Sequence, residues 1–337
     1  MAGLTLMAKV AENRLKASLA AGSGGAIVRG GGFGRGELTG FEFMTLPGAD
    51  ARATHKSVTQ NPGATGVAAP MSFGRKGTLE VRIATTPAEI DAAQALRYRV
   101  FYEEMSATPD AQTRASKRDV DRFDSFCDHL LVVDHKLAGA EGDALHPEAV
   151  VGCYRLLRQQ VAEQNGGFYT ASEYDIAPLL ARAGPEMNFL ELGRSCVLPP
   201  YRNKPTVELL WHGIAQYVAS RNLDVMFGCA SFENTDPQEL ALPLSYLHHF
   251  HMTPSDWYVR ALDDRFVEMN LIAKEDINPR EAWRALPPMI KGYLRAGCYI
   301  GDGAVIDTQF GTTDVLILFP VAQISERYLT KFGSTPV

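Results

Sequence analysis

The sequence predicts an α/β fold in which helices cover the faces of one mixed sheet. Short apolar segments of strand length alternate along the chain with longer segments of helical periodicity, an order typical of such folds. The 337 residues are 46% hydrophobic, which is enough to bury a sizeable core. No apolar run approaches the roughly 20 residues that a membrane-spanning helix needs.

The first half of the fold is predicted as a strand, a helix and two further strands. In "LEVRIA", residues 79–84, apolar and polar residues alternate as in a strand. Pro87 begins a helix over residues 87–105, because proline is favoured at the first helical position and helical periodicity follows it. "HLLVVD" at 129–134 and "AVVGCYRLL" at 149–157 are apolar strands joined by a polar connection that contains proline.

The next elements alternate between helix and strand. A loop and helix segment occupies residues 168–184, and "MNFLELGRSCVLP" at 187–199 is the following strand. Residues 206–222 have helical periodicity. "LDVMFGCASF" at 223–232 is a continuous apolar strand of the type that is buried on both faces.

The last third contains a predicted helical insertion at residues 237–290, where prolines separate helical segments. A further helix ends at Gly297, because glycine is favoured directly after a helix, and a strand follows it. "DVLILFPV" at 314–321 closes the fold as a buried strand.

Residues 1–77 form a predicted flexible tail ahead of a folded domain at 78–337. The tail holds 15 of the 30 glycines and nine basic residues against four acidic ones. Residues 1–20 place apolar side chains on one helical stripe, which suits an amphipathic helix on an anionic membrane surface. A frayed leader is the alternative. The glycine-rich run fits no G-x-G-x-x-G phosphate-binding motif.

Charge, cysteine usage and histidine spacing exclude several classes of protein. With a net charge of −6 and a pI near 5.8, the chain is not a general nucleic-acid binder. Five scattered cysteines without a C-x-x-C pair predict reduced thiols. No signal peptide is evident, so we expect a cytoplasmic protein, peripheral on the inner face of the membrane. "YLHHFH" at 246–251 has no cysteine or carboxylate at zinc spacing, so no metal site is predicted.

The order of elements resembles the GNAT acyltransferase fold, which implies a mixed, mostly antiparallel central sheet flanked by helices. Val197-Leu198-Pro199-Pro200-Tyr201-Arg202 is close to the V-x-P-x-x-R of that family, and a helix and a buried strand follow it. Within the superfamily, the chain resembles acyl-homoserine-lactone synthases and, more closely, the ornithine N-acyltransferases that make lyso-ornithine lipid from an acyl carrier protein thioester. The blocks that carry this resemblance are "LRYRVFYEEM", "DVDRFDSFCDHLLVVD", "VGCYRLL", "FYTASEYDI", "ELGRSCV" and "LPPMIKGYLRAGCYIGDGAVIDTQFGTTDVLI".

The acyl donor implied by the resemblance is an acyl carrier protein. Where the GNAT pattern has R-x-x-G-x-G/A, residues 202–207 read Arg-Asn-Lys-Pro-Thr-Val and contain no glycine. This departure argues against coenzyme A, and no resident cofactor is expected. A helix N-terminus offers free N–H groups and a positive dipole to the phosphopantetheine phosphate, and a basic rim attracts an acidic carrier protein. The expected binding residues are Arg202, Asn203, Lys204 and Thr206. An ordinary helix cap with surface charges is the alternative.

Glu191 is the candidate general base. Amide formation requires a neutral amine, so a base must take a proton from the α-ammonium of the acceptor. Burial in an apolar strand raises the pKa of a carboxyl group toward neutrality. The alternative is a buried ion pair between Glu191 and Arg194.

A bulge near Gly193 follows from the same stretch. Residues three apart face opposite sides of a regular strand, so only a bulge brings Arg194 to the side of Glu191, and glycine is a natural bulge residue. On that side Arg194 is expected to be the second catalytic residue. Such a bulge would also free N–H groups for an oxyanion. Cys196 suggests an acyl-cysteine mechanism instead, but no Cys-His pair at a familiar spacing supports it.

The acceptor is expected to bind near the acidic loop at residues 117–128. A diamino acid such as ornithine would compensate closely spaced carboxylates, whereas a solvated loop paired with Lys117 and Arg118 is the alternative. Arg155 or Arg194 could hold the acceptor carboxylate, and pairing of these arginines with the aspartates is equally open. The substrate-binding residues implied by the resemblance are Arg97, Asp121, Asp124 and Arg155.

The combined expectation is an N-acyltransferase that moves a 3-hydroxylated fatty acyl group from acyl carrier protein to the α-amine of L-ornithine, giving lyso-ornithine lipid. The acyl chain needs an apolar groove, expected between the segment after "SFENTDP" and the last strand. A homoserine-lactone-type synthase that uses S-adenosylmethionine is the nearest alternative. A non-catalytic module that binds lipid or carrier protein is the other.

Overall fold

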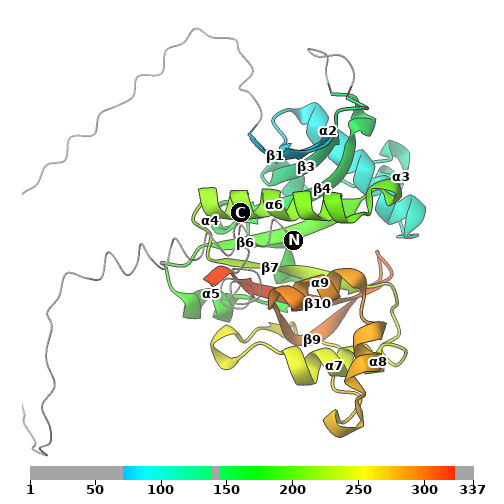
Figure 1. The fold of residues 1–337 in the computed structure, drawn as a ribbon. Helices are drawn as coiled ribbons and strands as arrows, with labels where there is room; N and C mark the ends of the chain where they lie inside the picture. The colour runs from blue at the N-terminus through cyan, green and yellow to red at the C-terminus, as the bar shows by residue number, and fades with distance from the viewer. Residues whose placement is uncertain (1–70, 139–144, 323–337) are drawn as a thin grey trace, which may run out of the picture. The chain divides into compact units, whose positions relative to one another are not determined.

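The structure is a computed structural model that describes residues 71–138 and 145–322 (Figure 1). The predicted tail up to residue 70, with its amphipathic helix, lies outside the described residues. The fold begins earlier than predicted, because β1 (Ser72–Lys76) pairs antiparallel with β2 (Leu79–Ile83). The start at 78 was wrong because "SFGRK" is a largely exposed edge strand and has no apolar run.

The described strands form one ten-stranded sheet in the order β1-β2-β3-β4-β6-β7-β10-β9-β8-β5. Neighbouring strands are antiparallel except for β6 with β7 and β8 with β9. The remaining strands are β3 (Asp128–Asp134), β4 (Val150–Arg158), β5 (Tyr174–Asp175), β6 (Phe189–Val197), β7 (Val225–Phe232), β8 (Arg260–Ala261), β9 (Tyr299–Asp307) and β10 (Thr312–Pro320). The predicted mixed, mostly antiparallel sheet is confirmed.

Helices cover this sheet, as predicted. The described α-helices are α2 (Pro87–Tyr98), α3 (Ala111–Ser116), α4 (Gln159–Gln164), α5 (Ala177–Ala183), α6 (Lys204–Ser220), α7 (Ala241–His251), α8 (Pro279–Ala285) and α9 (Pro288–Ala296). A π-helical segment, η1 (Arg99–Glu104), continues α2, and the 3₁₀ turns are η2 (Arg122–Ser125), η3 (Pro147–Ala149), η4 (Tyr169–Ser172), η5 (Pro199–Tyr201), η6 (Ser255–Trp257) and η7 (Lys274–Asp276). None of these described helices combines the length and the apolar character needed to cross a bilayer.

Local sequence signals explain the ends of two helices. The Thr86 hydroxyl accepts a hydrogen bond from the Glu89 amide at the start of α2, and the Glu89 carboxylate accepts one from the Thr86 amide, which completes a capping box. At the end of α9, Gly297 adopts a φ of 98°, a conformation that a side chain would disfavour. Both ends were predicted from proline and glycine positions.

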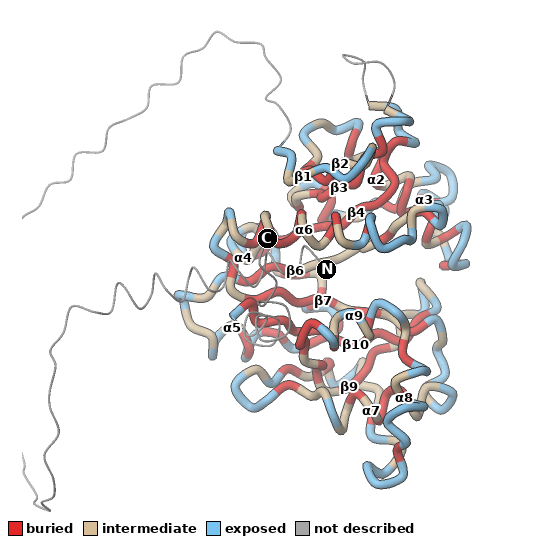
Figure 2. Tube along the Cα trace, in the orientation of Figure 1, coloured by how far each residue is buried: buried red, intermediate tan, exposed pale blue. Residues whose placement is uncertain are grey.

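The sheet core is tightest under α6, which packs against β1, β2 and β3. A Cβ atom at Gly213 of α6 would lie 2.5 Å from a methyl carbon of Val81, so this crossing requires glycine. Buried residues line the central strands, while the helices expose their outer faces (Figure 2).

The parallel pair β6 and β7 separates along its length. The two strands pair only over Phe189–Glu191 and Val225–Phe227. A Cβ atom at Gly228 would lie 2.2 Å from the carbonyl oxygen of Leu192, so glycine is required at the last point of close approach. Beyond it the strands form no further pairs, which opens a fork in the sheet.

Candidate active site

A cavity of about 150 Å³ lies at the fork between β6 and β7. Its walls come from η4, β6, β7 and the β9–β10 hairpin, with α9 and η1 at its rim. The ionisable residues that line it are Arg155, Glu173, Glu191, Arg194, Asp307 and Asp314. Two predicted catalytic residues and one predicted substrate-binding residue therefore share one cavity.

Glu191 is 4% exposed and is held by the backbone of η4. The Tyr169 amide donates to its Oε2 at 2.9 Å, and the Thr170 amide donates to its Oε1 at 2.6 Å. Burial raises the pKa of Glu191, although these hydrogen bonds favour the ionised form. The raised pKa agrees with the requirement for a base near neutrality. The alternative ion pair with Arg194 is not formed, because Arg194 pairs with aspartates instead.

Arg194 lies in the predicted bulge. Cys153 of β4 pairs with Cys196, and Arg155 pairs with Gly193, so Arg194 and Ser195 together oppose a single residue of β4. The bulge is confirmed, but glycine does not supply its unusual backbone. Arg194 itself adopts a left-handed φ of 49°, whereas a Cβ atom at Gly193 would meet nothing within 4 Å.

The bulge aims the guanidinium of Arg194 at the acidic loop and at two aromatic rings. Its Nε donates to Asp119 at 3.1 Å and its Nη2 to Asp121 at 3.3 Å. The guanidinium carbon lies 4.9 Å from the ring centre of Tyr169 and 5.0 Å from that of Phe310. Strain at a non-glycine residue is thus offset by ion pairs and cation–π contacts.

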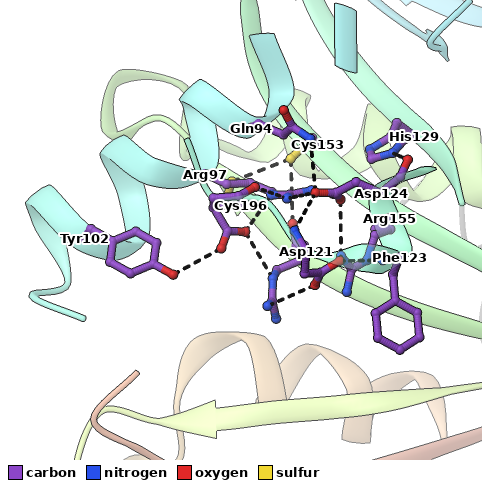
Figure 3. Close-up of polar contacts among 12 residues, drawn as sticks. Gln94, Arg97, Tyr102, Asp121, Phe123, Asp124, His129, Cys153, Arg155 and Cys196 are labelled. Atoms are coloured by element: carbon purple, nitrogen blue, oxygen red, sulfur yellow. Dashed lines mark hydrogen bonds and ion pairs between the residues drawn. The ribbon is translucent and has the colours of Figure 1, made fainter. Parts of the chain in front are cut away.

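The aspartates of the acidic loop are paired with arginines (Figure 3). Arg97, 1% exposed, donates to Asp119 at 2.7 Å and to both oxygens of Asp124 at 2.8 and 2.7 Å. Arg155 donates to Asp121 at 2.6 Å. Although burial alone would raise it, the guanidinium of Arg97 holds the pKa of Asp124 well below its usual range.

This pairing changes the expected role of the acidic loop. Three arginines neutralise three aspartates, so little negative charge is left to bind the amines of an acceptor. Arg97, Asp121 and Asp124 do not line the cavity, whereas Arg155 does. The interpretation in which the arginines pair with the aspartates is confirmed, and the loop is not a solvated acidic patch.

A second group of carboxylates, not predicted as a site, lines the same cavity. Glu173 follows η4, Asp307 ends β9 and Asp314 lies in β10, and one carboxylate oxygen from each lies within 4.8 Å of the others. Burial, reinforced by the nearby Asp314, raises the pKa of Glu173 to about 7. The only sequence signal was an aspartate at the head of the apolar run "DVLILFPV".

The four predicted donor-binding residues lie at the start of α6 and do not line the cavity. Arg202 forms a bidentate ion pair with Glu104, in which Nη2 of Arg202 lies 2.7 Å from Oε2 of Glu104. Asn203 caps α6 and accepts hydrogen bonds from the amide and the hydroxyl of Thr206. Lys204 is exposed and lies 3.8 Å from Glu208. Asn203 and Thr206 thus form the ordinary helix cap that was the stated alternative.

An apolar cavity adjoins the ionisable one and shares Leu192, Cys229 and Tyr293 with it. Its other walls include Trp211 of α6 and Phe319 of β10. β10 lines this cavity together with β6, β7, α6 and Tyr293 of α9, and no residue of the predicted insertion at 237–290 belongs to its lining. Cys196 lines neither cavity, and its thiol lies buried 3.7 Å from that of Cys153, which agrees with a packed core thiol.

Comparison with known proteins places this site in a family. Residues 96–212 match the acetyltransferase (GNAT) domain. The chain is 54% identical over 270 residues to the L-ornithine N(alpha)-acyltransferase of Rhizobium meliloti (strain 1021), covering 80% of this chain and 89% of that protein. It is 52% identical over 261 residues to the protein of the same name from Agrobacterium fabrum, covering 77% and 87%. Among solved structures it is similar to FeeM, an N-acyl amino acid synthase from uncultured soil microbes, at 14% identity and a TM-score of 0.41, covering 75% and 97%.

Proposed function

Because the chain belongs to the family of L-ornithine N(alpha)-acyltransferases, which have a GNAT domain, we propose that it joins a fatty acyl group to the α-amine of L-ornithine at the fork between β6 and β7. The observation that carries this site is the buried carboxylate of Glu191, with its raised pKa, in a cavity that also contains Arg155 and Arg194. The product would be lyso-ornithine lipid.

In the proposed reaction, Glu191 takes a proton from the α-ammonium and the neutral amine attacks the thioester carbonyl. A C–N bond forms, and the carbonyl oxygen becomes an oxyanion that N–H groups of the Arg194–Ser195 bulge can stabilise. The C–S bond then breaks and the sulfur, whose thiol has a pKa of ~8.5, leaves as a thiolate. The nitrogen, positively charged once the C–N bond has formed, gives up its second proton to this thiolate, and Glu191 releases the first proton to solvent. No bond to Cys196 is needed.

The arginines can orient the acceptor. Arg155 and Arg194 line the cavity and are each fixed by aspartates, so a substrate carboxylate would meet guanidiniums that are already positioned. Arg97, Asp121 and Asp124 would then act on the substrate through these two arginines. This arrangement would offer the acceptor carboxylate N–H donors of Arg155 and Arg194 that are already fixed in position by their ion pairs.

The donor in this proposal is acyl carrier protein. The open edges of β6 and β7 beyond Gly228 offer unpaired backbone groups that could hold the amides of a phosphopantetheine arm. The start of α6, with Arg202 and the exposed Lys204, would meet the phosphate and the acidic carrier. The adjoining apolar cavity, with Trp211 and Phe319, would take the first part of the acyl chain. Peripheral membrane association through residues 1–77 is part of the same proposal.

The test is the mass of the product formed from L-ornithine and a 3-hydroxyacyl thioester of acyl carrier protein. Parallel reactions replace the donor by the acyl-coenzyme A and the acceptor by S-adenosylmethionine. The proposal predicts N-acylornithine only with the carrier-protein donor. Product from S-adenosylmethionine alone, or equal rates with coenzyme A, would contradict the acceptor or the donor respectively.

A further inference from the structure

The carboxylates of Glu173, Asp307 and Asp314 differ from the aspartates of the acidic loop, because no cation of the described residues forms an ion pair with them. Among the described residues, no arginine, lysine or histidine forms an ion pair with any of the three. Arg265, which lies near them, donates instead to the backbone carbonyls of Ser172 and Ile306. We call the group uncompensated because none of its members forms an ion pair within the described residues, although Arg265 and Arg194 act on it at longer range.

Two oxygens of this group are buried without a hydrogen-bond partner. Oε2 of Glu173 and Oδ1 of Asp314 have none in the described part of the chain, although these residues are only 3% and 8% exposed. Buried carboxylate oxygens are rarely left unpaired, since desolvation costs free energy that a partner must offset. Both residues belong to the lining of the cavity in which the acceptor would bind.

The spacing of the three oxygens suits an ammonium group. An –NH₃⁺ has three donors in a tetrahedral arrangement, and acceptors at ~2.8 Å from its nitrogen lie roughly 4.6 Å apart. The three carboxylates supply one oxygen each within 4.8 Å of one another. The same limit would also admit a divalent metal bound by oxygens at about 2.0–2.6 Å, so the test below includes a metal arm.

We propose that Glu173, Asp307 and Asp314 bind the δ-ammonium of ornithine, and so select a diamino acid and direct acylation to its α-amine. This inference rests on the proposed function. Held by carboxylates, the δ-nitrogen keeps its proton and has no lone pair with which to attack the thioester. The α-amine is left to Glu191 elsewhere in the same cavity.

The backbone links the two carboxylate sites. Glu191 accepts hydrogen bonds from the amides of Tyr169 and Thr170, and the same 3₁₀ turn leads directly to Glu173. The position of the proposed base therefore helps to fix the position of the proposed ammonium site. A rigid separation between the two would discriminate among diamino acids of different length.

The test compares two acceptors of equal chain length, L-ornithine and L-norvaline, which lacks the δ-amine. Wild-type enzyme should prefer ornithine in kcat/KM, and Glu173→Gln and Asp314→Asn should each lower the ornithine-to-norvaline ratio by about tenfold or more, since a charge-assisted hydrogen bond is lost. A folding defect lowers activity on both acceptors and leaves the ratio unchanged. If a variant is inactive, calorimetric titration with each amino acid supplies the same ratio.

The control is Asp302→Asn, on the same strand as Asp307 but bonded to Tyr258 and outside the cavity lining. An unchanged ratio in both site variants, or an equal fall in the control, would overturn the assignment. So would loss of wild-type activity on EDTA dialysis that Mg²⁺, Ca²⁺ or Mn²⁺ restores, because the group would then hold a metal. A wild type that acylates neither amino acid would instead overturn the proposed function.

Discussion

Two groups of three carboxylates in this protein carry the same formal charge in opposite surroundings. Asp119, Asp121 and Asp124 are matched by three guanidiniums, whereas no cation in the described part of the chain forms an ion pair with Glu173, Asp307 or Asp314. The first group forms one polar network between α2, η2 and the β-sheet. The second lines a cavity and leaves two buried oxygens unpartnered.

The difference shows that closely spaced acidic residues in a sequence do not by themselves indicate a cation-binding site. The aspartates lie within six residues of one another and look like a cation site, yet their partners come from α2, β4 and β6 and cancel their charge. The second group is not evident in the sequence, because Glu173 lies far from Asp307 and Asp314 along the chain. A structural network differs from a candidate binding site in whether arginines pair with its carboxylates, and not in how many carboxylates it has.

The compensated group is Asp119, Asp121 and Asp124 with their arginines. The largest effect on stability should come from removing one of these arginines. Arg97→Met would leave Asp119 and Asp124 buried without their main partner, so we expect a loss of about 3–5 kcal/mol in the free energy of unfolding. Denaturant titration measures it. Arg118→Met, which breaks an exposed pair with Asp91, is the matched control and should cost less than ~1 kcal/mol. Equal losses of unfolding free energy in the two variants would show that the buried network of Arg97 contributes no more to stability than the pair at Arg118.

Glu191 is an intermediate case, a buried carboxylate compensated by backbone amides rather than by arginine. Glu191→Gln should lower kcat by about a hundredfold or more while the KM for L-ornithine changes little, because proton removal is lost and binding is not. Steady-state kinetics with the carrier-protein donor measures both. The exposed Glu163→Gln on α4 is the control. A kcat within severalfold of wild type would remove Glu191 as the base.

Local patterns in the sequence predicted much of the fold. Pro87 and Gly297 marked the ends of two helices, and the apolar runs gave β7 and β10 because such signals act over a few residues. The bulge followed from placing Glu191 and Arg194 in one strand, but its left-handed residue is Arg194 rather than the glycine. A network that stabilises this backbone comes from elsewhere in the chain, so the local sequence does not contain it.

The candidate site was predictable only in part, for the same reason. Glu191, Arg194 and Arg155 were found because they lie on β6 and its neighbour β4. The uncompensated carboxylates come together because Glu173, which follows η4, meets the β9–β10 hairpin that carries Asp307 and Asp314, and periodicity does not reveal this contact. Charge compensation is also a property of the folded state. The sequence therefore pointed to the acidic loop, whereas the uncompensated group lies elsewhere.

The uncompensated group should also have a pH signature in the absence of substrate. The pKa of Glu173 is raised to about 7 from an ordinary 4.5, so the folded state keeps a proton that the unfolded state releases. Wild-type stability should then fall, relative to Glu173→Gln, as pH rises from about 5 to 8, by about 2 kcal/mol. Urea titrations at several pH values measure this difference. L-ornithine should diminish it at pH 8, and a difference that does not depend on pH would contradict the raised pKa.

The smallest effect should come from the partly exposed member of the compensated group. Asp121→Asn keeps an acceptor for Arg155 and Arg194, and these arginines retain Asp124 and Asp119 as partners. We expect the KM for L-ornithine to change by less than about threefold, whereas Glu173→Gln raises it by about tenfold or more. Each variant removes one carboxylate, and the two carboxylates differ in that arginines pair with Asp121 but not with Glu173. A difference in KM between the variants therefore reports on this pairing. If Asp121→Asn instead raised the KM as much as Glu173→Gln, the aspartates of the acidic loop would bind the ammonium groups directly, and the contrast between the two groups would fail.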